Sequence, residues 1–324
     1  MAWVADDDLP MDTSRDLFHF KEGALAYAGY YFHNETNPLH SHSFVEIAFV
    51  TAGSAIHQSL AGPQELTVGD VILLRPGAWH GYDQCAELAV YNCCFSGDLL
   101  RRELSWTRED PLLGYLLWSG PYSAQARGIL TTHLDRDALE RCKVHLAALD
   151  ALRGKPVTLY QGDIVGRLAL LLSLIGRAVA ETHAPLPGAG GPAHPAIGHA
   201  LRMLEDRLDH AWTLTELASR MHLAPGYLVR LFTNCTGVPP MAYLARLRAE
   251  HAATLLLHTD QSISCIGRAV GWPDQNYFAR RFKAHFGLSA TTYRERFAHR
   301  AAGSSAGRLG ATAPAAAGAA RLSG

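Results

Sequence analysis

Histidine and glutamate side chains are closely spaced in one segment near the start of the chain. His40, His42 and Glu46 stand two and four positions apart, with Phe44 between the last two. On a β-strand, residues two apart point to the same face, so a single strand over 39–49 would bring these side chains together. Imidazole nitrogens and a carboxylate suit Zn, Fe, Mn or Ni. We therefore predict a polar site here that binds either a divalent metal or a small molecule.

A fourth candidate ligand follows a predicted strand and turn. The segment GDVILLRPGAWHGY places His80 after Pro76 and Gly77. If one barrel contains both segments, this imidazole joins the first three side chains in the barrel mouth. Two interpretations stay open: the cluster coordinates a metal, or it hydrogen-bonds an effector without one. The predicted ligand set is His40, His42, Glu46 and His80.

The spacing in these two segments is similar to the two motifs of the cupins. His-x-His-x3-Glu-x6-Gly, ending at Gly53, matches the first motif in full. The second motif is matched around His80 with one departure, because Pro76 and Gly77 are adjacent instead of one residue apart. The resemblance implies a β-barrel with its site in the mouth. His57 and Tyr82 are further candidates for the lining of this pocket.

The segment that contains these residues has the pattern of a barrel followed by helices. Between residues 17 and 96, β-branched and aromatic runs alternate with turn signals, as in sandwiches and barrels. From about Ser123 the apolar spacing becomes helical, and we expect helices at 135–153 and 161–182. The second helix is apolar on nearly all sides, so it must pack on its own barrel or on a second chain. We predict that these two helices form a homodimer interface through Leu168, Leu170, Leu171, Leu172, Leu174 and Ile175.

Changes in composition divide the chain into parts. PLPGAGGPAHP contains too much Pro and Gly for a helix and is typical of a linker. The Ala-, Gly- and Ser-rich end has no apolar period, which indicates disorder. The predicted α+β organisation is a disordered N-terminus at 1–16, a cupin-like domain at 17–183, a linker at 184–196, an all-α domain at 197–298, and a disordered tail at 299–324.

Charge is distributed unevenly between these parts. Residues 1–183 contain 14 Lys and Arg against 22 Asp and Glu, a balance of −8, whereas residues 195–297 contain 12 against 8, a balance of +4. A basic C-terminal module fits a DNA partner. The chain has neither a long uninterrupted apolar run nor a basic-then-apolar leader, so we expect a cytoplasmic protein without a membrane partner. The six cysteines have no CxxC spacing, and we assign them no chemistry.

The last third of the chain contains an internal repeat. Leu217 recurs 49 positions later as Ile266, whereas Phe232 recurs 50 positions later as Phe282. Apolar anchors that repeat with a slip of one residue describe two helix-turn-helix units, the second with a turn one residue longer. The second block also pairs Leu228 with Phe278, Arg230 with Arg280, Gly237 with Gly287 and Tyr243 with Tyr293.

Each unit contains one helix suited to enter a major groove. The two helices are GYLVRLFTNCTG and QNYFARRFKAHFG, and we expect Tyr277 to face the core with the neighbouring phenylalanines. Arg230 and Arg280 can bond guanine bidentately, whereas Arg281 and Lys283 are better placed for phosphates. The predicted DNA-binding residues are Val229, Arg230, Thr233, Gln275, Asn276, Arg280, Arg281 and Lys283.

The segment SISCIGRAVGWPDQNYFARRFKAHFGLSATTYRERF resembles the C-terminal signature of the AraC/XylS family of transcription regulators, and the resemblance covers about residues 195–297. The chain departs from the family pattern at Cys265, Gly267 and Trp272. The resemblance implies a cupin-like effector and dimerisation domain, followed by two DNA-binding units, in a protein that most often activates transcription and contacts RNA polymerase. The stretch 39–95 is most similar to the sugar-responsive members, such as those answering rhamnose.

These observations favour a sequence-specific transcription regulator, an activator and not an enzyme, that responds to a small molecule bound in its barrel. Its expected partners are double-stranded DNA, the effector, RNA polymerase and a second copy of the chain. The alternative is a metal-dependent cupin enzyme fused to a DNA-binding module. The alternative is less favoured because no further acid–base pair accompanies the histidine cluster.

Overall fold

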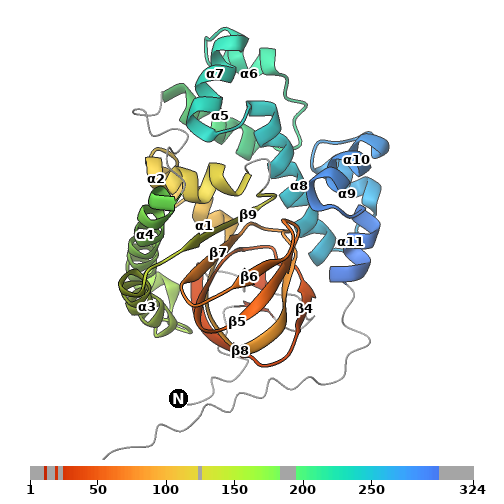
Figure 1. The fold of residues 1–324 in the computed structure, drawn as a ribbon. Helices are drawn as coiled ribbons and strands as arrows, with labels where there is room; N and C mark the ends of the chain where they lie inside the picture. The colour runs from red at the N-terminus through yellow and green to blue at the C-terminus, as the bar shows by residue number, and fades with distance from the viewer. Residues whose placement is uncertain (1–10, 13–18, 21–24, 123–125, 183–194, 299–324) are drawn as a thin grey trace, which may run out of the picture.

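The computed structural model describes residues 11–12, 19–20, 25–122, 126–182 and 195–298. In its N-terminal half, seven antiparallel strands curl into a barrel (Figure 1). Strand β8 pairs with β3, β4 and β5, while β5 also pairs with β6 and β7, and β9 lies at the edge next to β7. The strands are β3 Ala26–His33, β4 Asn37–His40, β5 Val45–Ser59, β6 Gln64–Leu66, β7 Asp70–Leu74, β8 His80–Phe95 and β9 Ile129–His133.

Alternating side chains of the long strands face two different cores. On β5, Val45, Ile47 and Phe49 are buried together with apolar residues of the helices outside the barrel. On β8, Leu88 and Val90 belong to a second core made of barrel residues. The two-residue period of a strand separates these faces, so the barrel interior and its helical cover each receive one face of β5 and β8.

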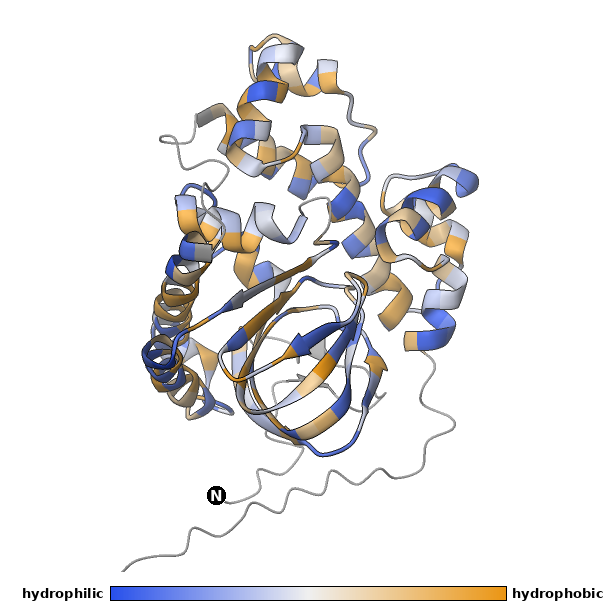
Figure 2. Cartoon of the chain, viewed as in Figure 1, coloured by the Kyte–Doolittle hydropathy of each residue, from blue (hydrophilic) through white to orange (hydrophobic). Residues whose placement is uncertain are grey.

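Helices cover one side of the barrel (Figure 1). Helices α3 Arg136–Asp150 and α4 Val157–Thr182 pack on each other and on the barrel, and α4 is hydrophobic along most of its length (Figure 2). One feature differs from the sequence-based expectation: β9 lies after Ser123, where the apolar spacing predicts helices. Short helices precede β9. These are α1 Gly97–Arg101, η2 Ser105–Arg108, α2 Pro111–Gly114, η3 Tyr115–Ser119 and η4 Gly120–Tyr122.

Most apolar side chains of α4 are buried within its own domain. Leu168, Leu171, Leu172 and Ile175 are at most 1% exposed, whereas Leu170 is 56% exposed. The apolarity that suggested a dimer interface is therefore explained mainly by the barrel. The dimer itself stays a prediction.

Two predicted boundaries need correction. Within the segment expected to lack order at 1–16, β1 Met11–Asp12 pairs with β2 His19–Phe20, and the remaining residues of that segment lie outside the described part of the chain. Most of the predicted linker and the tail at 299–324 also lie outside it. Helix α5 begins at Pro195, inside the predicted linker, because the first turn of a helix tolerates proline.

The C-terminal half contains two helix-turn-helix units, as the repeat predicts. One unit is built on α5 Pro195–Asp206, α6 Leu214–Arg220 and α7 Pro225–Thr236, and the other on α9 Ile263–Ala269, α10 Gln275–Phe286 and α11 Ala290–Phe297. The turn between α9 and α10 is one residue longer than the turn between α6 and α7. Local hydrogen bonds start the helices: the side chains of Thr213, Ser262 and Asp274 cap α6, α9 and α10.

Helix α8 Pro240–His258 joins the two units (Figure 1). Its first half contributes Tyr243, Leu244 and Leu247 to the core of the first unit. Its second half contributes Ala253 and Leu256, among others, to the core of the second. One helix shared by two cores holds the units at a fixed spacing. Among the helices of the described residues, none is long and apolar enough to cross a membrane.

A buried ion pair connects α8 to the sensor barrel. Arg75, which follows β7, donates from Nε and Nη2 to the two carboxylate oxygens of Glu250 at 3.1 and 3.0 Å. The Tyr122 hydroxyl also donates to Glu250, and both partners of the ion pair are buried. A buried charge left without its partner is costly. The pair therefore fixes how the DNA-binding half sits on the barrel.

We predict that Arg75→Met lowers the free energy of unfolding by about 3–5 kcal/mol, because Glu250 loses its countercharge. The double variant Arg75→Met, Glu250→Leu should recover most of this loss, since an apolar pair can replace a buried ion pair. Guanidinium unfolding of the full chain measures both. A double variant no more stable than Arg75→Met would contradict the explanation.

Candidate effector site and DNA interface

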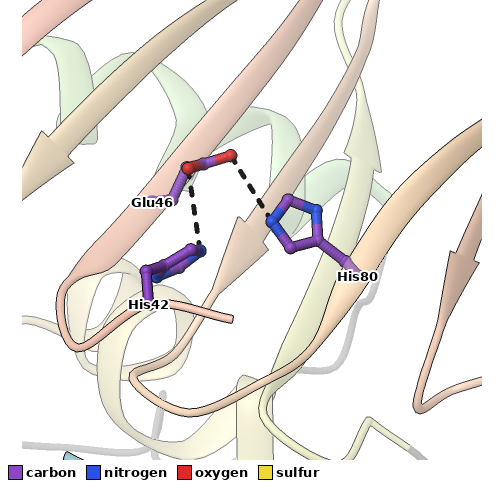
Figure 3. A group of neighbouring side chains, drawn as sticks. All are labelled: His42, Glu46 and His80. Atoms are coloured by element: carbon purple, nitrogen blue, oxygen red, sulfur yellow. Dashed lines mark ion pairs between the residues drawn. The ribbon is translucent and has the colours of Figure 1, made fainter. Parts of the chain in front are cut away.

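Three buried side chains meet inside the barrel. The carboxylate of Glu46 lies between the imidazoles of His42 and His80 (Figure 3). Its two oxygens are 3.6 Å from Nε2 of His42 and 3.9 Å from Nε2 of His80. One ligand atom from each residue lies within 4.8 Å of the others. All three residues belong to the ligand set that the sequence predicts, and the structure brings them together.

The way the chain brings them together differs from the prediction of one strand over 39–49. Strand β4 ends at His40, and β5 begins only at Val45. His42 lies in the loop between these strands, where its Nδ1 is 2.9 Å from the carbonyl oxygen of Phe44. The loop, and not the alternation of a strand, turns this imidazole inward.

His40 does not join the three-residue group. Its Nδ1 lies 2.9 Å from the carbonyl oxygen of Pro38, and its ring centroid is 4.3 Å from that of His80. The residue is half-buried. Of the four predicted ligands, the structure thus groups His42, Glu46 and His80, and His40 borders this group.

Further polar side chains surround the group. The ring of His57 lies 5.6 Å from the rings of both His80 and Tyr82, and the Cys94 thiol is 3.9 Å from a Glu46 oxygen. Cys94 was assigned no chemistry from the sequence, although its pairing with Glu46 across β5 and β8 places it here. Several buried polar atoms in this region have no hydrogen-bond partner within the described chain: Nε2 of His42, Oε1 of Glu46, Nε2 of His57, both ring nitrogens of His80, the Tyr82 hydroxyl and Oδ1 of Asn92.

Burial decides the charge states in the site. It lowers the pKa of His42 to about 3 and that of His57 to about 4, and in both the neighbouring His40 adds to the effect. The pKa of His80 is also well below its ordinary value, for the same reason. Burial raises the pKa of Glu46 to about 7, although the Cys94 thiol partly opposes the shift. The imidazoles are thus neutral at pH 7, the form that accepts hydrogen bonds and binds metals.

The donor set fits a divalent transition metal. Two neutral imidazoles and one carboxylate are a common ligand set for such ions, with positions left open for another molecule. The unpartnered nitrogens and oxygen also favour a bound ligand, because buried polar atoms without a hydrogen-bond partner are costly. The same atoms could instead hydrogen-bond a polar effector directly.

The side of α10 that the sequence predicts to face DNA is exposed. Gln275, Asn276, Arg280, Arg281 and Lys283 are all exposed, while Phe278, Phe282 and Phe286 are buried. Tyr277, which was expected to face the core, is 43% exposed and contacts Trp272 edge to face. It stands beside the predicted base-reading residues.

Helix α7 presents a less open face. Arg230 is exposed and lies above the ring of Tyr227 at 5.8 Å. Val229 and Thr233 are half-buried, and the Thr233 hydroxyl is buried without a partner within the described chain. Arg230 is therefore the one predicted residue of this helix that is fully available to a groove.

Comparisons with known proteins match both halves of the chain. Residues 22–132 match the AraC-like ligand binding domain, and residues 217–296 match a helix-turn-helix domain. The transcriptional activator RhaR of Yersinia pseudotuberculosis is 26% identical over 284 residues, which cover 88% of this chain and 93% of the relative. The transcriptional activator RhaS of Escherichia fergusonii is 26% identical over 259 residues, or 80% of this chain and 87% of the relative.

Among solved structures, ToxT from Vibrio cholerae aligns with 85% of this chain and 99% of its own, at 11% identity and a TM-score of 0.49. The C-terminal domain of the response regulator yesN from Fusobacterium nucleatum aligns with 31% of this chain and 99% of its own, at 31% identity and a TM-score of 0.30.

The raised pKa of Glu46 predicts a pH-dependent cost in the metal-free protein. Between its ordinary value of 4.5 and about 7, the folded state holds the proton that the unfolded chain has lost. The folded state therefore binds more protons, and stability falls as the pH rises through this window. The loss is about 3 kcal/mol at most.

Glu46→Gln removes this group, so the variant should gain stability relative to the original chain between pH 4.5 and pH 7.5. His42 titrates in the opposite sense, losing stability as the pH falls from 6.5 through about 3, and it does so in both proteins. Unfolding with denaturant in the presence of a chelator measures the difference. Parallel pH profiles for the two proteins would show that Glu46 is not perturbed.

Proposed function

This chain belongs to the AraC family of transcription regulators, and we propose that it reads DNA with α7 and α10 under the control of a small effector bound in its barrel. The observation that carries the proposal is the buried group His42, Glu46 and His80, with its unpartnered polar atoms, in the same chain as two exposed recognition helices. The buried polar group suits a bound ligand, and the exposed recognition helices suit the major groove of DNA.

The two units read DNA unequally. On α10, Gln275, Asn276 and Arg280 offer hydrogen bonds to adenine or guanine, and Arg281 and Lys283 reach phosphates. On α7, only Arg230 among the predicted residues is exposed. Because α8 fixes the spacing of the units, each chain covers successive major-groove segments about 34 Å apart along one face of the duplex.

Arg280→Ala should relax the preference at particular base pairs by about 1–3 kcal/mol, because a bidentate arginine–guanine contact is lost. Lys283→Ala is the matched control on the same helix: it should weaken all sequences alike and reduce the salt dependence by about one unit of slope. Binding-site selection with each variant tests this. If Arg280→Ala kept the preferred sequence and lowered affinity uniformly, Arg280 would be a phosphate contact.

The effector is a small polar molecule, and we propose a sugar. Neutral imidazoles, the Tyr82 hydroxyl and one carboxyl line the site. Such groups both donate and accept hydrogen bonds, as the hydroxyls of a sugar require. The kinship with RhaR and RhaS, both named as transcriptional activators, supports the further inference that this protein activates transcription through contact with RNA polymerase. Its DNA target implies that it works in the cytoplasm.

A divalent metal, if bound, is held by His42, Glu46 and His80. It would supply a Lewis-acid position for an effector hydroxyl. We take Zn²⁺ as the probe. The chelated protein should bind one Zn²⁺ per chain, and His42→Ala or His80→Ala should lower this affinity by at least about tenfold.

His40→Ala is the matched control for the metal experiment, because His40 lies outside the three-residue group; its Zn²⁺ affinity should stay close to that of the original chain. Calorimetry measures all four proteins, and aldoses including rhamnose are titrated in parallel with and without Zn²⁺. Aldose binding without Zn²⁺ binding would contradict the proposed metal site and would support the proposed effector site. Turnover of an aldose by the Zn²⁺-loaded protein would favour the enzyme alternative.

We propose a homodimer formed through the outer face of α3 and α4. Val144, Leu159 and Leu170 are large apolar side chains exposed there, by 64, 77 and 56%, and exposed apolar residues on adjacent helices are typical of an interface. Leu170→Glu should give a monomer at micromolar concentration in sedimentation velocity, where the original chain sediments as a dimer. A monomeric original chain would contradict the proposal.

A further inference from the structure

The two loops that bring His42 and His80 to the site also touch the DNA-binding half. Loop 41–44 joins β4 to β5, and loop 75–79 joins β7 to β8. The loops are tied to each other, since the Gly77 amide donates to the carbonyl oxygen of His42 at 2.8 Å. On their outer side lies the second helix-turn-helix unit, beside the barrel (Figure 1). The effector site and this unit thus share two short loops as their common wall.

One side chain of the second unit bonds to both loops. The hydroxyl of Tyr293, on α11, donates to the carbonyl oxygen of Gly77 at 2.8 Å. Its single proton is used there, so the Ser41 hydroxyl, 2.7 Å away, donates to the tyrosine oxygen. Ser41 and Tyr293 are both buried. Ser41 directly precedes His42 in the chain, and the Gly77 amide is hydrogen-bonded to the carbonyl oxygen of His42. Both residues that Tyr293 contacts are therefore directly linked to His42.

Gly77 shows how closely the unit approaches. It has a φ of +83°, and a Cβ on it would lie 2.7 Å from the Cβ of Ala253 and 2.9 Å from Cζ of Phe286. Only glycine therefore allows both this backbone conformation and this contact. The adjacent Pro76 and Gly77 are where the sequence departs from the cupin spacing, and here the departure coincides with the docking surface.

Other contacts extend the same surface. The indole Nε1 of Trp79, the residue before His80, donates to the carbonyl oxygen of Phe286 at 3.0 Å. Leu60, from the turn after β5, is buried in the core of the second unit. The end of α10 is thereby held on the barrel rim, while its start, with Gln275 and Asn276, stays exposed.

The repeat supplies an internal comparison. Tyr243 stands at the position of the first unit that corresponds to Tyr293, and both side chains are buried. The Tyr243 hydroxyl, however, donates to Glu205 of its own unit at 2.7 Å. Glu205 is in turn ion-paired with Arg108 of the sensor half. Tyr243 therefore reaches the sensor through a second residue, whereas Tyr293 bonds to the sensor directly.

We propose that occupancy of the site between His42 and His80 controls how firmly the second helix-turn-helix unit is held on the barrel, with Tyr293 as the residue that transmits it. The inference rests on the proposed effector site. A group that contacts both imidazoles ties the two loops together and favours the docked unit. Coupling between two sites is reciprocal, so loosening the dock must also loosen the loops that present the two histidines.

Amide hydrogen exchange on the full chain tests this in both directions. His80→Ala changes a side chain inside the barrel, and it should raise exchange severalfold at 286–297 in the second unit. Tyr293→Phe removes one hydroxyl in the second unit, and it should raise exchange severalfold at 41–44 and 77–80. Tyr243→Phe is the matched control and should leave 41–44 and 77–80 at the original rates. Should His80→Ala fail to fold, His80→Gln and Ser41→Ala replace it.

Exchange that rises only within the domain carrying the substitution would overturn the inference, as would an equal effect of Tyr243→Phe on the two loops. DNA binding by the same variants separates this result from the proposed function. If the original chain shows no sequence-selective DNA binding, the proposed function is wrong, whatever the exchange pattern. Selective DNA binding without exchange coupling overturns only the role of Tyr293.

Discussion

Helix α8 is constrained on three sides, and the arrangement of the DNA-binding half depends on it. Its first half is buried in one helix-turn-helix unit and its second half in the other, while Glu250 between them is buried against Arg75 of the barrel. A helix packed in this way has little freedom to bend or turn. The spacing of α7 and α10, and the orientation of both toward the sensor, therefore follow from a single rigid element. Motion of the DNA-binding half relative to the barrel must break or remake the Arg75–Glu250 pair.

The group of His42, Glu46 and His80 shows that burying polar side chains inside a barrel costs free energy. Glu46 and its neighbouring imidazoles are withdrawn from water, and their shifted pKa values measure that withdrawal. Unpartnered polar atoms persist in a folded protein when something else compensates them. A bound ligand is the compensation that we propose for these atoms. Loops 41–44 and 75–79 contact both this group and the second helix-turn-helix unit, which is the basis of the coupling that we propose.

Features that depend on neighbours in the chain were predictable. The side chains of Thr213, Ser262 and Asp274 each accept a hydrogen bond from the backbone amide three residues later. The one-residue slip of the repeat corresponds to the longer turn between α9 and α10. The single strand over 39–49 was wrong because residue spacing cannot reveal a turn between two short strands. Strand β9 was missed because a five-residue run beside long helices has too weak a pattern of its own.

The sequence by itself determined the family, the two helix-turn-helix units, the exposed arginines Arg230 and Arg280, and the residue types of a polar barrel site. Periodicity and local capping encode these features directly. Only the tertiary structure decided that His40 lies outside the group of His42, Glu46 and His80 and that Cys94 lies beside it. It also decided that Tyr293, and not its repeat partner, bonds to the sensor. Ser41 and Tyr293 are 252 residues apart, and a contact over that distance depends on how whole domains pack, which no local pattern records.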